Sequence, residues 1–333
     1  MVRQQGVMRA GMLLGLLVLA VTGRADEAAV VRAIEKLGGW VEVDANRSGK
    51  PVVGVRLYGP NGKRLKEPDN TKVIPAILKE LKELKSLESL DLYNLEVSEA
   101  GLRELKELKG LQELVLSGSQ LTDTGLKGLK ELKSLKRLDL LGTKVTDAGL
   151  KELKELKSLQ ELYLSKTQVT DAGLKELKEL KHLQSLDLCS TKVTDAGLQE
   201  LKELKSLESL ELRYTQITDK GLKGLKELKS LESLDLRYTQ ITDAGLKELK
   251  ELKGLWKLCL GSTQVTDVGL KELKELKSLR YVNLADSQIT DAGLKELKEL
   301  KDLKLLEVFS TRVTDAGVKE LQGALPGLLR IDR

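Results

Sequence analysis

Residues with strong chemistry are scarce in this chain. Its 333 residues include one histidine, two cysteines and only 3% aromatic side chains. His182 has no cysteine or histidine at a zinc-ligand spacing, and no motif marks a serine–histidine–aspartate arrangement. The recurring glycines do not form a dinucleotide or phosphate loop. We therefore expect no enzyme activity, no cofactor and no metal, and we interpret His182 as a surface turn residue.

An excess of one charge is also missing. The chain has 56 basic and 51 acidic residues, and three of the arginines precede Asp26, which leaves a net charge of +2 beyond that point. A nucleic-acid-binding protein would show a basic face. The mixed signs predict a solvated surface and no nucleic-acid partner.

Long apolar runs are missing beyond the N-terminus. Residues 10–21 are apolar but too few to span a bilayer. Two arginines precede this run, and small residues follow it before Asp26. This order predicts a cleavable signal peptide over residues 1–25 rather than a buried first helix. No cysteine follows the run, so a bacterial lipid anchor is not indicated. We expect a secreted or periplasmic protein with no membrane span.

A unit of 24 residues occupies most of the chain and recurs ten times without a gap. Its V-T-D-A-G element begins at Val97, Leu121, Val145, Val169, Val193, Ile217, Ile241, Val265, Ile289 and Val313. A fixed period of this size predicts a stacked repeat architecture. The repeats also align with one another, so constant positions should hold the stack together and varied positions should carry function.

Each unit predicts one short strand and one helix. Leu138 and Leu140 form an L-x-L pair, which places two apolar side chains on one face of a strand. Thr146 begins T-D-A-G, where a threonine or aspartate caps a helix, and leucines at every third position follow it. Stacking buries the leucines of neighbouring units. Because helices are about 10 Å wide and strands about 4.8 Å apart, the parallel sheet should line the concave side and the helices the convex side.

The pattern L-x-x-L-x-L-x-x-T-x-V/I resembles the leucine-rich repeat family over residues 87–333, with ten full units and a partial C-terminal one. The T-D-x-G-L form looks like that of bacterial and F-box-associated members, although no F-box is found here. The resemblance implies an α/β leucine-rich-repeat solenoid, or horseshoe, with a concave sheet and convex α-helices. Thr143 stands where the family carries asparagine or cysteine, which bonds to backbone between turns, and we expect its hydroxyl to do the same.

The two ends depart from the repeat. Residues 26–86 are predicted to form an N-terminal cap, with a helix over residues 27–37 and strands over residues 40–43 and 51–57, the last resembling a degenerate first repeat strand. Turn signals occur at residues 46–49 and near Pro60 and Pro68.

At the other end, Leu328 and Ile331 indicate the start of an eleventh strand, one residue later than the regular spacing. A truncated reading frame explains this end, and so does a partner or second copy that covers it, which would make an oligomer through the C-terminal end.

The cysteines are not expected to pair. Cys189 and Cys259 fall on strands three repeats apart, which is roughly 14 Å at about 4.8 Å per strand. That separation is too large for a disulfide, so we predict two free thiols.

The varied positions lie on the strands and should face the concave side. Arg213 and Tyr214 align with Arg237 and Tyr238 one repeat later, and duplication of one repeat explains this likeness as well as function does. Neighbouring arginines repel unless acids such as Asp235 offset them, and tyrosine and arginine are enriched at binding hot spots. Further along, Trp256 and Tyr281 form a second aromatic cluster, with a cation–π contact to Arg280 expected at Trp256. The candidate ligand-binding residues are Arg213, Tyr214, Asp235, Arg237, Tyr238, Trp256 and Tyr281.

These observations predict an exported leucine-rich-repeat binding module that recognises a protein partner, or an extracellular polymer, through its concave sheet. The alternative is a structural, cell-envelope or adhesion protein without a single specific ligand. The helices rich in lysine and glutamate are interpreted as a soluble convex surface.

Overall fold

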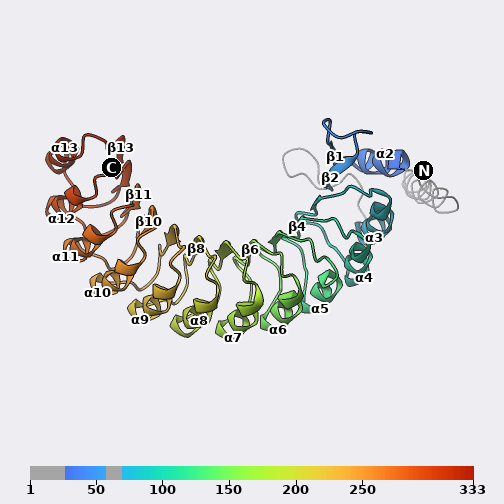
Figure 1. The fold of residues 1–333 in the computed structure, drawn as a ribbon, viewed down its shortest axis with the longest axis horizontal. Coiled ribbons are helices and arrows are strands. Elements are labelled where there is room, and N and C mark those ends of the chain that lie inside the picture. Colours follow the sequence, from blue (N-terminus) through green and yellow to red (C-terminus); the bar gives the residue numbers. More distant parts are fainter. Residues whose placement is uncertain (1–26, 58–69) are drawn as a thin grey trace, which may run out of the picture. The chain divides into compact units, whose positions relative to one another are not determined.

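The computed structural model describes residues 27–57 and 70–333. The predicted signal peptide and the predicted loops near Pro60 and Pro68 lie outside these residues. The chain divides into two compact units, one ending at Val145 and one beginning at Thr146, and each is described by itself (Figure 1). Within the described ranges, no helix has the length and apolar character needed to cross a bilayer.

The first unit opens with the helix and two strands that the sequence predicts. Helix α2 (Glu27–Leu37) buries Val30, Ile34 and Leu37, one apolar face of the helix. Strands β1 (Trp40–Val43) and β2 (Val52–Arg56) pair antiparallel. Strand β2 then pairs parallel with the first repeat strand, Val55 opposite Leu90. The predicted degenerate repeat strand is therefore confirmed. The division at residue 86 stays a prediction.

The rest of the first unit alternates short helices and strands. Its elements are α3 (Asn70–Glu80), η2 (Leu81–Glu83), β3 (Ser89–Asp91), α4 (Glu99–Glu104), η3 (Leu105–Glu107), β4 (Glu113–Val115), α5 (Asp123–Leu126), η4 (Lys127–Leu129) and β5 (Arg137–Asp139). Strands β3, β4 and β5 are parallel and pair in chain order.

The second unit repeats the same plan. Its strands are β6 (Glu161–Tyr163), β7 (Ser185–Asp187), β8 (Ser209–Glu211), β9 (Ser233–Asp235), β10 (Lys257–Cys259), β11 (Tyr281–Asn283), β12 (Leu305–Glu307) and β13 (Arg330–Asp332). All pair parallel with their neighbours in chain order. Leu306 lies opposite Ile331, so the predicted eleventh strand and its one-residue shift are confirmed. In Figure 1 the strands of this unit lie on its inner side and the helices on its outer side, which makes it an α/β solenoid.

The helices of the second unit are shorter than the leucine pattern suggests. They are α6 (Asp147–Leu150), α7 (Asp171–Leu174), α8 (Asp195–Glu200), α9 (Asp219–Leu222), α10 (Asp243–Leu246), α11 (Asp267–Leu270), α12 (Asp291–Glu296) and α13 (Asp315–Ala324). Most continue as a 3₁₀ helix. These segments are η5 (Lys151–Glu155), η6 (Lys175–Glu179), η7 (Leu201–Glu203), η8 (Lys223–Glu227), η9 (Lys247–Glu251), η10 (Lys271–Glu275) and η11 (Leu297–Glu299). Leu150, Leu153 and Leu156 are fully buried, and their spacing of three residues matches the three residues per turn of a 3₁₀ helix.

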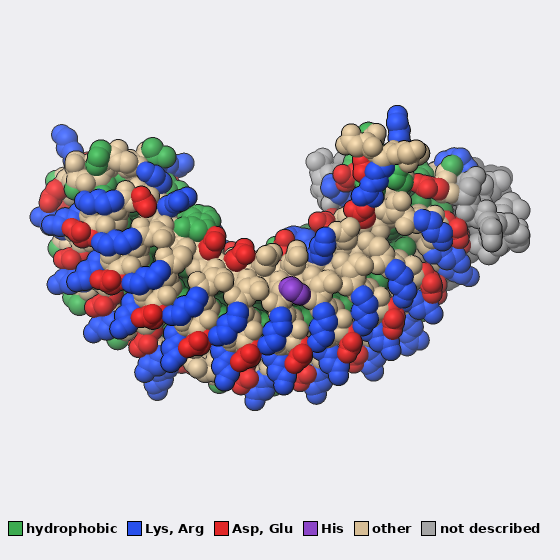
Figure 2. Space-filling model, in the orientation of Figure 1, with side chains coloured by type: hydrophobic (Ala, Val, Ile, Leu, Met, Phe, Trp, Pro, Cys, Tyr) green, Lys and Arg blue, Asp and Glu red, His purple; other side chains and the backbone are tan. Residues whose placement is uncertain are grey.

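The outer face carries charges of both signs. Figure 2 shows basic and acidic side chains interspersed over the helices of the second unit. Lys181 lies 3.4 Å from Glu203 and Lys229 lies 3.3 Å from Glu251, and all four side chains are about half exposed. Exposed pairs of this kind add little stability, so this surface mainly keeps the helices solvated.

The recurring threonine that follows each strand bonds differently from the sequence prediction. Thr143 Oγ1 donates to the carbonyl of Leu140 at 2.7 Å, and Thr167, Thr191 and Thr215 repeat this bond in their own units. The expected bond between turns is therefore wrong. A hydroxyl is short and has one proton, and the nearest acceptor is the carbonyl three residues earlier, so the bond closes the turn within one repeat.

A second polar contact joins each repeat of the second unit to the next. Asp195 Oδ1 accepts the backbone N–H of Thr218 at 2.7 Å, and Asp195 Oδ2 accepts its hydroxyl at 2.6 Å. The same pair of bonds recurs from Asp147 to Thr170 through Asp291 to Thr314, at 2.6–2.8 Å. Thr218 also caps its own helix by accepting from Lys220 N. The aspartate of T-D-A-G is therefore an inter-repeat acceptor, a role that the sequence reading missed.

The glycine of T-D-A-G is explained by the same contact. A Cβ on Gly221 would lie 2.5 Å from Asp195 Oδ1 and 3.2 Å from the Asp195 backbone. The aspartate of the preceding repeat thus occupies the space that a side chain would need. Close approach between repeats requires glycine here.

Removal of one aspartate from this ladder tests its contribution. Asp219→Ala deletes the acceptor for both Thr242 N–H and Thr242 Oγ1, and we expect it to destabilise the chain by about 1–3 kcal/mol. Lys220→Ala is the matched control, because neighbouring repeats carry alanine there and the lysine is exposed. Guanidinium unfolding followed by circular dichroism measures both variants. Equal midpoints for Asp219→Ala and the unchanged chain would contradict this role.

Candidate functional site

The varied strand residues of the second unit stand in register on its inner face. Glu211, Asp235, Cys259, Asn283 and Glu307 are consecutive partners across β8 to β12. Because side chains alternate along a strand, the residues two positions before and after them share the same face. Asp235, Arg213, Arg237 and Tyr281 therefore share this face, whereas Tyr214, Tyr238 and Trp256 lie just beyond the ends of their strands.

Asp235 is the centre of the first cluster. Its side chain is only 1% exposed, and its Oδ2 accepts from Arg237 Nη2 at 2.6 Å while its Oδ1 accepts from Arg237 Nε at 3.0 Å. These bonds raise the pKa of Arg237 further above its usual value. Arg213 Nε lies 3.5 Å from Asp235 Oδ2 without hydrogen-bond geometry, so it is an ion pair only.

The two arginines are thus offset by acids, as the sequence predicted. Arg213 also lies 3.4 Å from Glu211. Asp235, however, is buried, and its contact with a ligand stays a prediction. Asp235 positions Arg237, and removal of Arg237 would leave a buried carboxylate with only a weaker partner.

Tyr214 and Tyr238 form a stacked pair beside these arginines. Their ring centroids lie 4.2 Å apart with an interplanar angle of 15°, and the residues are 56% and 45% exposed. Both have a positive φ, 57° and 58°. Ser190 and Ser262 occupy the same left-handed position in the flanking repeats. This conformation costs an L-residue about 1–2 kcal/mol, and bulky side chains are especially rare in it, so the fold alone does not favour tyrosine here.

Trp256 and Tyr281 lie in a separate open groove. The groove has a volume of about 830 Å³ and is lined by these two aromatic residues with Lys257, Arg280 and Lys304, and also by Glu232, Gly254, Ser278 and Leu305. The Trp256 indole N–H donates to Glu232 at 3.3 Å, where the sequence had predicted a contact with Arg280. Lys257 Nζ lies 5.9 Å from the centre of the Tyr281 ring.

The structure therefore separates the seven predicted residues into two clusters. The sequence reading missed Lys257, Lys304 and Glu232 as neighbours of Trp256. The sequence does contain a pattern that points to Lys304. The residue after the first leucine of each repeat changes from glutamate at position 232 to tryptophan, arginine and lysine in the next three repeats.

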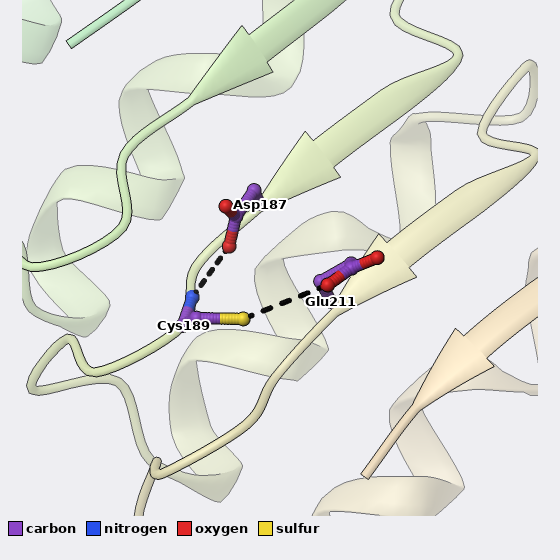
Figure 3. A group of neighbouring side chains, drawn as sticks. All are labelled: Asp187, Cys189 and Glu211. Carbon is purple, nitrogen blue, oxygen red and sulfur yellow. Dashed lines mark hydrogen bonds between the residues drawn. The ribbon is translucent and has the colours of Figure 1, made fainter. Parts of the chain in front are cut away.

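A third group contains a cysteine. Asp187, Cys189 and Glu211 point toward one another from β7, the loop after it, and β8 (Figure 3), and their ligand atoms lie within 4.8 Å of one another. Cys189 N donates to Asp187 at 2.8 Å and Cys189 Sγ donates to Glu211 at 3.8 Å. Burial, followed by the Asp187 carboxylate, raises the pKa of the Cys189 thiol to about 12. A cysteine binds a metal as the thiolate, which the raised pKa disfavours, and Glu211 is already paired with Arg213. The hydrogen bonds and the ion pair of this group are therefore formed within the protein.

The histidine and the two cysteines have the surroundings that the sequence predicts. His182 is exposed in a turn. Cys189 and Cys259 are buried and free.

A parallel sheet backed by short helices, with varied side chains along its inner face, defines a class of repeat proteins suited to protein binding. Leucine rich repeat models match residues 181–241 in one case and residues 111–130, 131–154, 155–178 and 275–298 in the other. The chain belongs to the leucine-rich repeat family. The bacterial and F-box-like subtype stays a prediction.

A solved structure shares this fold, and two others are similar to parts of the chain. An internalin from Listeria monocytogenes is 20% identical with a TM-score of 0.62, over 86% of this chain and 91% of that chain. A leucine-rich-repeat protein of Leptospira interrogans is 24% identical with a TM-score of 0.49, over 77% and 80%. An internalin C2 from Listeria monocytogenes is 26% identical with a TM-score of 0.45, over 71% and 83%. Comparison with curated proteins finds no match.

The thiols provide a test of how tightly the sheet is packed. Burial raises the pKa of Cys189 and of Cys259 to about 12, above the ordinary value of about 8.5. The reactive form is the thiolate, so at about pH 8 neither thiol should react with a disulfide reagent in the folded chain. Both should react after unfolding in guanidinium. Stoichiometric reaction of the folded chain would show that the inner face opens.

Proposed function

We propose that this chain is an exported binding module that recognises a protein partner through the inner face of its second unit. The observation that supports this proposal most strongly is the stacked pair of Tyr214 and Tyr238. Both residues are about half exposed, although each has a left-handed backbone that disfavours bulky side chains. Exposed aromatic surface that is held at a conformational cost points to contact with a partner.

The surroundings of the pair also favour binding. Tyrosine presents a large rigid area with few rotatable bonds, so little side-chain entropy is lost in a complex. Arg237 is already held by Asp235, and it directly precedes Tyr238 in the chain. A surface ordered before association loses less free energy on binding.

Export and localisation are part of the proposal and rest on residues 1–25 of the sequence. Their charge and apolar order support a secreted or periplasmic location. A structural envelope or adhesion role predicts instead that no saturable partner exists. Self-association through the C-terminal end stays a prediction.

Replacing the tyrosines tests the proposal without disturbing the buried ion pairs. Tyr214→Asn with Tyr238→Asn removes the aromatic surface, and asparagine tolerates the left-handed conformation. We expect saturable capture of a protein from the native extracellular fraction to weaken by at least tenfold. The unfolding free energy should change by less than about 1 kcal/mol, because relief of backbone strain offsets the lost stacking.

Val268→Ala is the control. It removes an exposed apolar side chain from helix α11, where neighbouring repeats carry alanine, and should leave capture unchanged. Undiminished capture by the tyrosine variant would overturn the proposed contact. The absence of any saturable partner for the unchanged chain would favour the structural role.

A further inference from the structure

One row of side chains crosses the edge of the second unit's sheet where the strands begin. Its members are Glu208, Glu232, Trp256, Arg280 and Lys304, one from each of five consecutive repeats. Each backbone N–H in this row donates to the carbonyl of the preceding member at 2.8–2.9 Å. The row is therefore a continuous line of neighbours at about the interstrand spacing of 4.8 Å.

The charge of this row changes sign along its length. Glu208 and Glu232 come first, Trp256 lies between, and Arg280 and Lys304 follow. In the earlier repeats of the unit the same position holds the neutral residues Gln160 and Gln184. The helices hardly vary in sequence over these repeats, so this change of charge occurs at the edge of the sheet and not on the helical face.

The groove at the basic end has cations without carboxylate partners. Lys257, Arg280 and Lys304 line it with a single acid, Glu232. Within residues 27–57 and 70–333, no ion pair joins any of the three cations to a carboxylate. Among the described residues, Lys304 Nζ donates only to the carbonyl of Gly327, at 3.3 Å. Trp256 is 39% exposed beside them, with its indole N–H held by Glu232. An unpaired cationic groove next to an exposed indole suits a ligand that has both carboxylates and an apolar group.

We propose that this groove binds an extended acidic segment of a protein partner, with an apolar side chain on Trp256 and carboxylates on Arg280 and Lys304. This inference rests on the proposed protein-binding function and specifies the chemistry of one contact. From Trp256 to Lys304 the row spans two strand spacings, about 10 Å, which is the length of about three extended residues.

The acids at the other end of the row select against a uniformly anionic polymer. Such a polymer, if longer than the basic stretch, meets Glu232 and then Glu208, and like charges repel at this distance. A polypeptide avoids the repulsion by placing a basic or neutral side chain there. The row therefore selects a segment with the complementary charge order, basic or neutral opposite Glu208 and Glu232 and acidic opposite Arg280 and Lys304.

The experiment uses defined probes. A fluorescent octapeptide carries two lysines, then glycine, leucine and glycine, then three acidic residues, and a second peptide has the same composition with alternating charges. The first should bind the chain saturably and at least fivefold more tightly than the second. Its affinity should fall as salt rises. An octapeptide of aspartate alone and dextran sulfate are the anionic comparisons, and both should bind more weakly than the first peptide.

Charge reversal locates the contact. Arg280→Glu with Lys304→Glu should weaken binding of the first peptide by at least tenfold. Lys247→Glu with Lys271→Glu makes the same net change on the helical face, where both lysines are exposed, and should have no effect. Glu232→Lys extends the basic row and should strengthen binding of the aspartate peptide severalfold. Circular dichroism confirms that each variant folds.

Three results would overturn the inference: no saturable binding of the first peptide, equal binding by the Arg280 and Lys304 variant, or tighter binding of dextran sulfate that depends on the same two cations. The proposed function is tested separately through Tyr214 and Tyr238. If the peptide assays fail but partner capture still depends on Tyr214 and Tyr238, only the proposal about the groove is overturned, and the proposed function stands.

Discussion

The rest of the structure depends on the contact between an aspartate of one repeat and a threonine of the next. In the second unit, the aspartate of every repeat from Asp147 to Asp291 accepts both the N–H and the hydroxyl of a threonine 23 residues later. Glycine follows because the carboxylate fills the space of its missing side chain. With the buried leucines, this contact sets the spacing of the units on the helical side, while the parallel strands set it on the inner side.

Because these contacts hold the repeats together, the exposed residues of the inner face can differ from one repeat to the next. Changing Ser190 to Tyr214 or Glu232 to Trp256 between repeats alters neither the leucines nor the aspartate ladder. The face does, however, keep some structure of its own. Asp235 is buried beneath Arg237 and Arg213, so part of the varied surface holds other side chains in place, and the exposed aromatic and cationic groups remain for contact.

Much of the fold could be predicted from the sequence because its signals are local and repeated. The L-x-L pairs locate the strands, and the helix over residues 27–37 follows from one apolar face. The site was harder to predict. Which arginine lies over Asp235, and whether Trp256 turns toward Glu232 or Arg280, depends on side-chain packing between neighbouring strands. The bond of Thr143 to Leu140 and that of Asp195 to Thr218 were missed for the same reason, since a repeat pattern shows which residues recur and not which atoms meet.

The central claim is that constant positions hold the stack and varied positions bind. It is tested most directly by selecting an unbiased displayed peptide library on the chain and on a variant in which the varied aromatic and cationic residues are reset to asparagine or glutamine. The reset variant carries Tyr214→Asn, Tyr238→Asn, Trp256→Gln, Arg280→Gln and Lys304→Gln. We predict that peptides selected on the unchanged chain bind it saturably and do not bind the reset variant, although both chains unfold at the same temperature. Equal binding to both chains, or a reset variant that unfolds at a clearly lower temperature, would contradict the account.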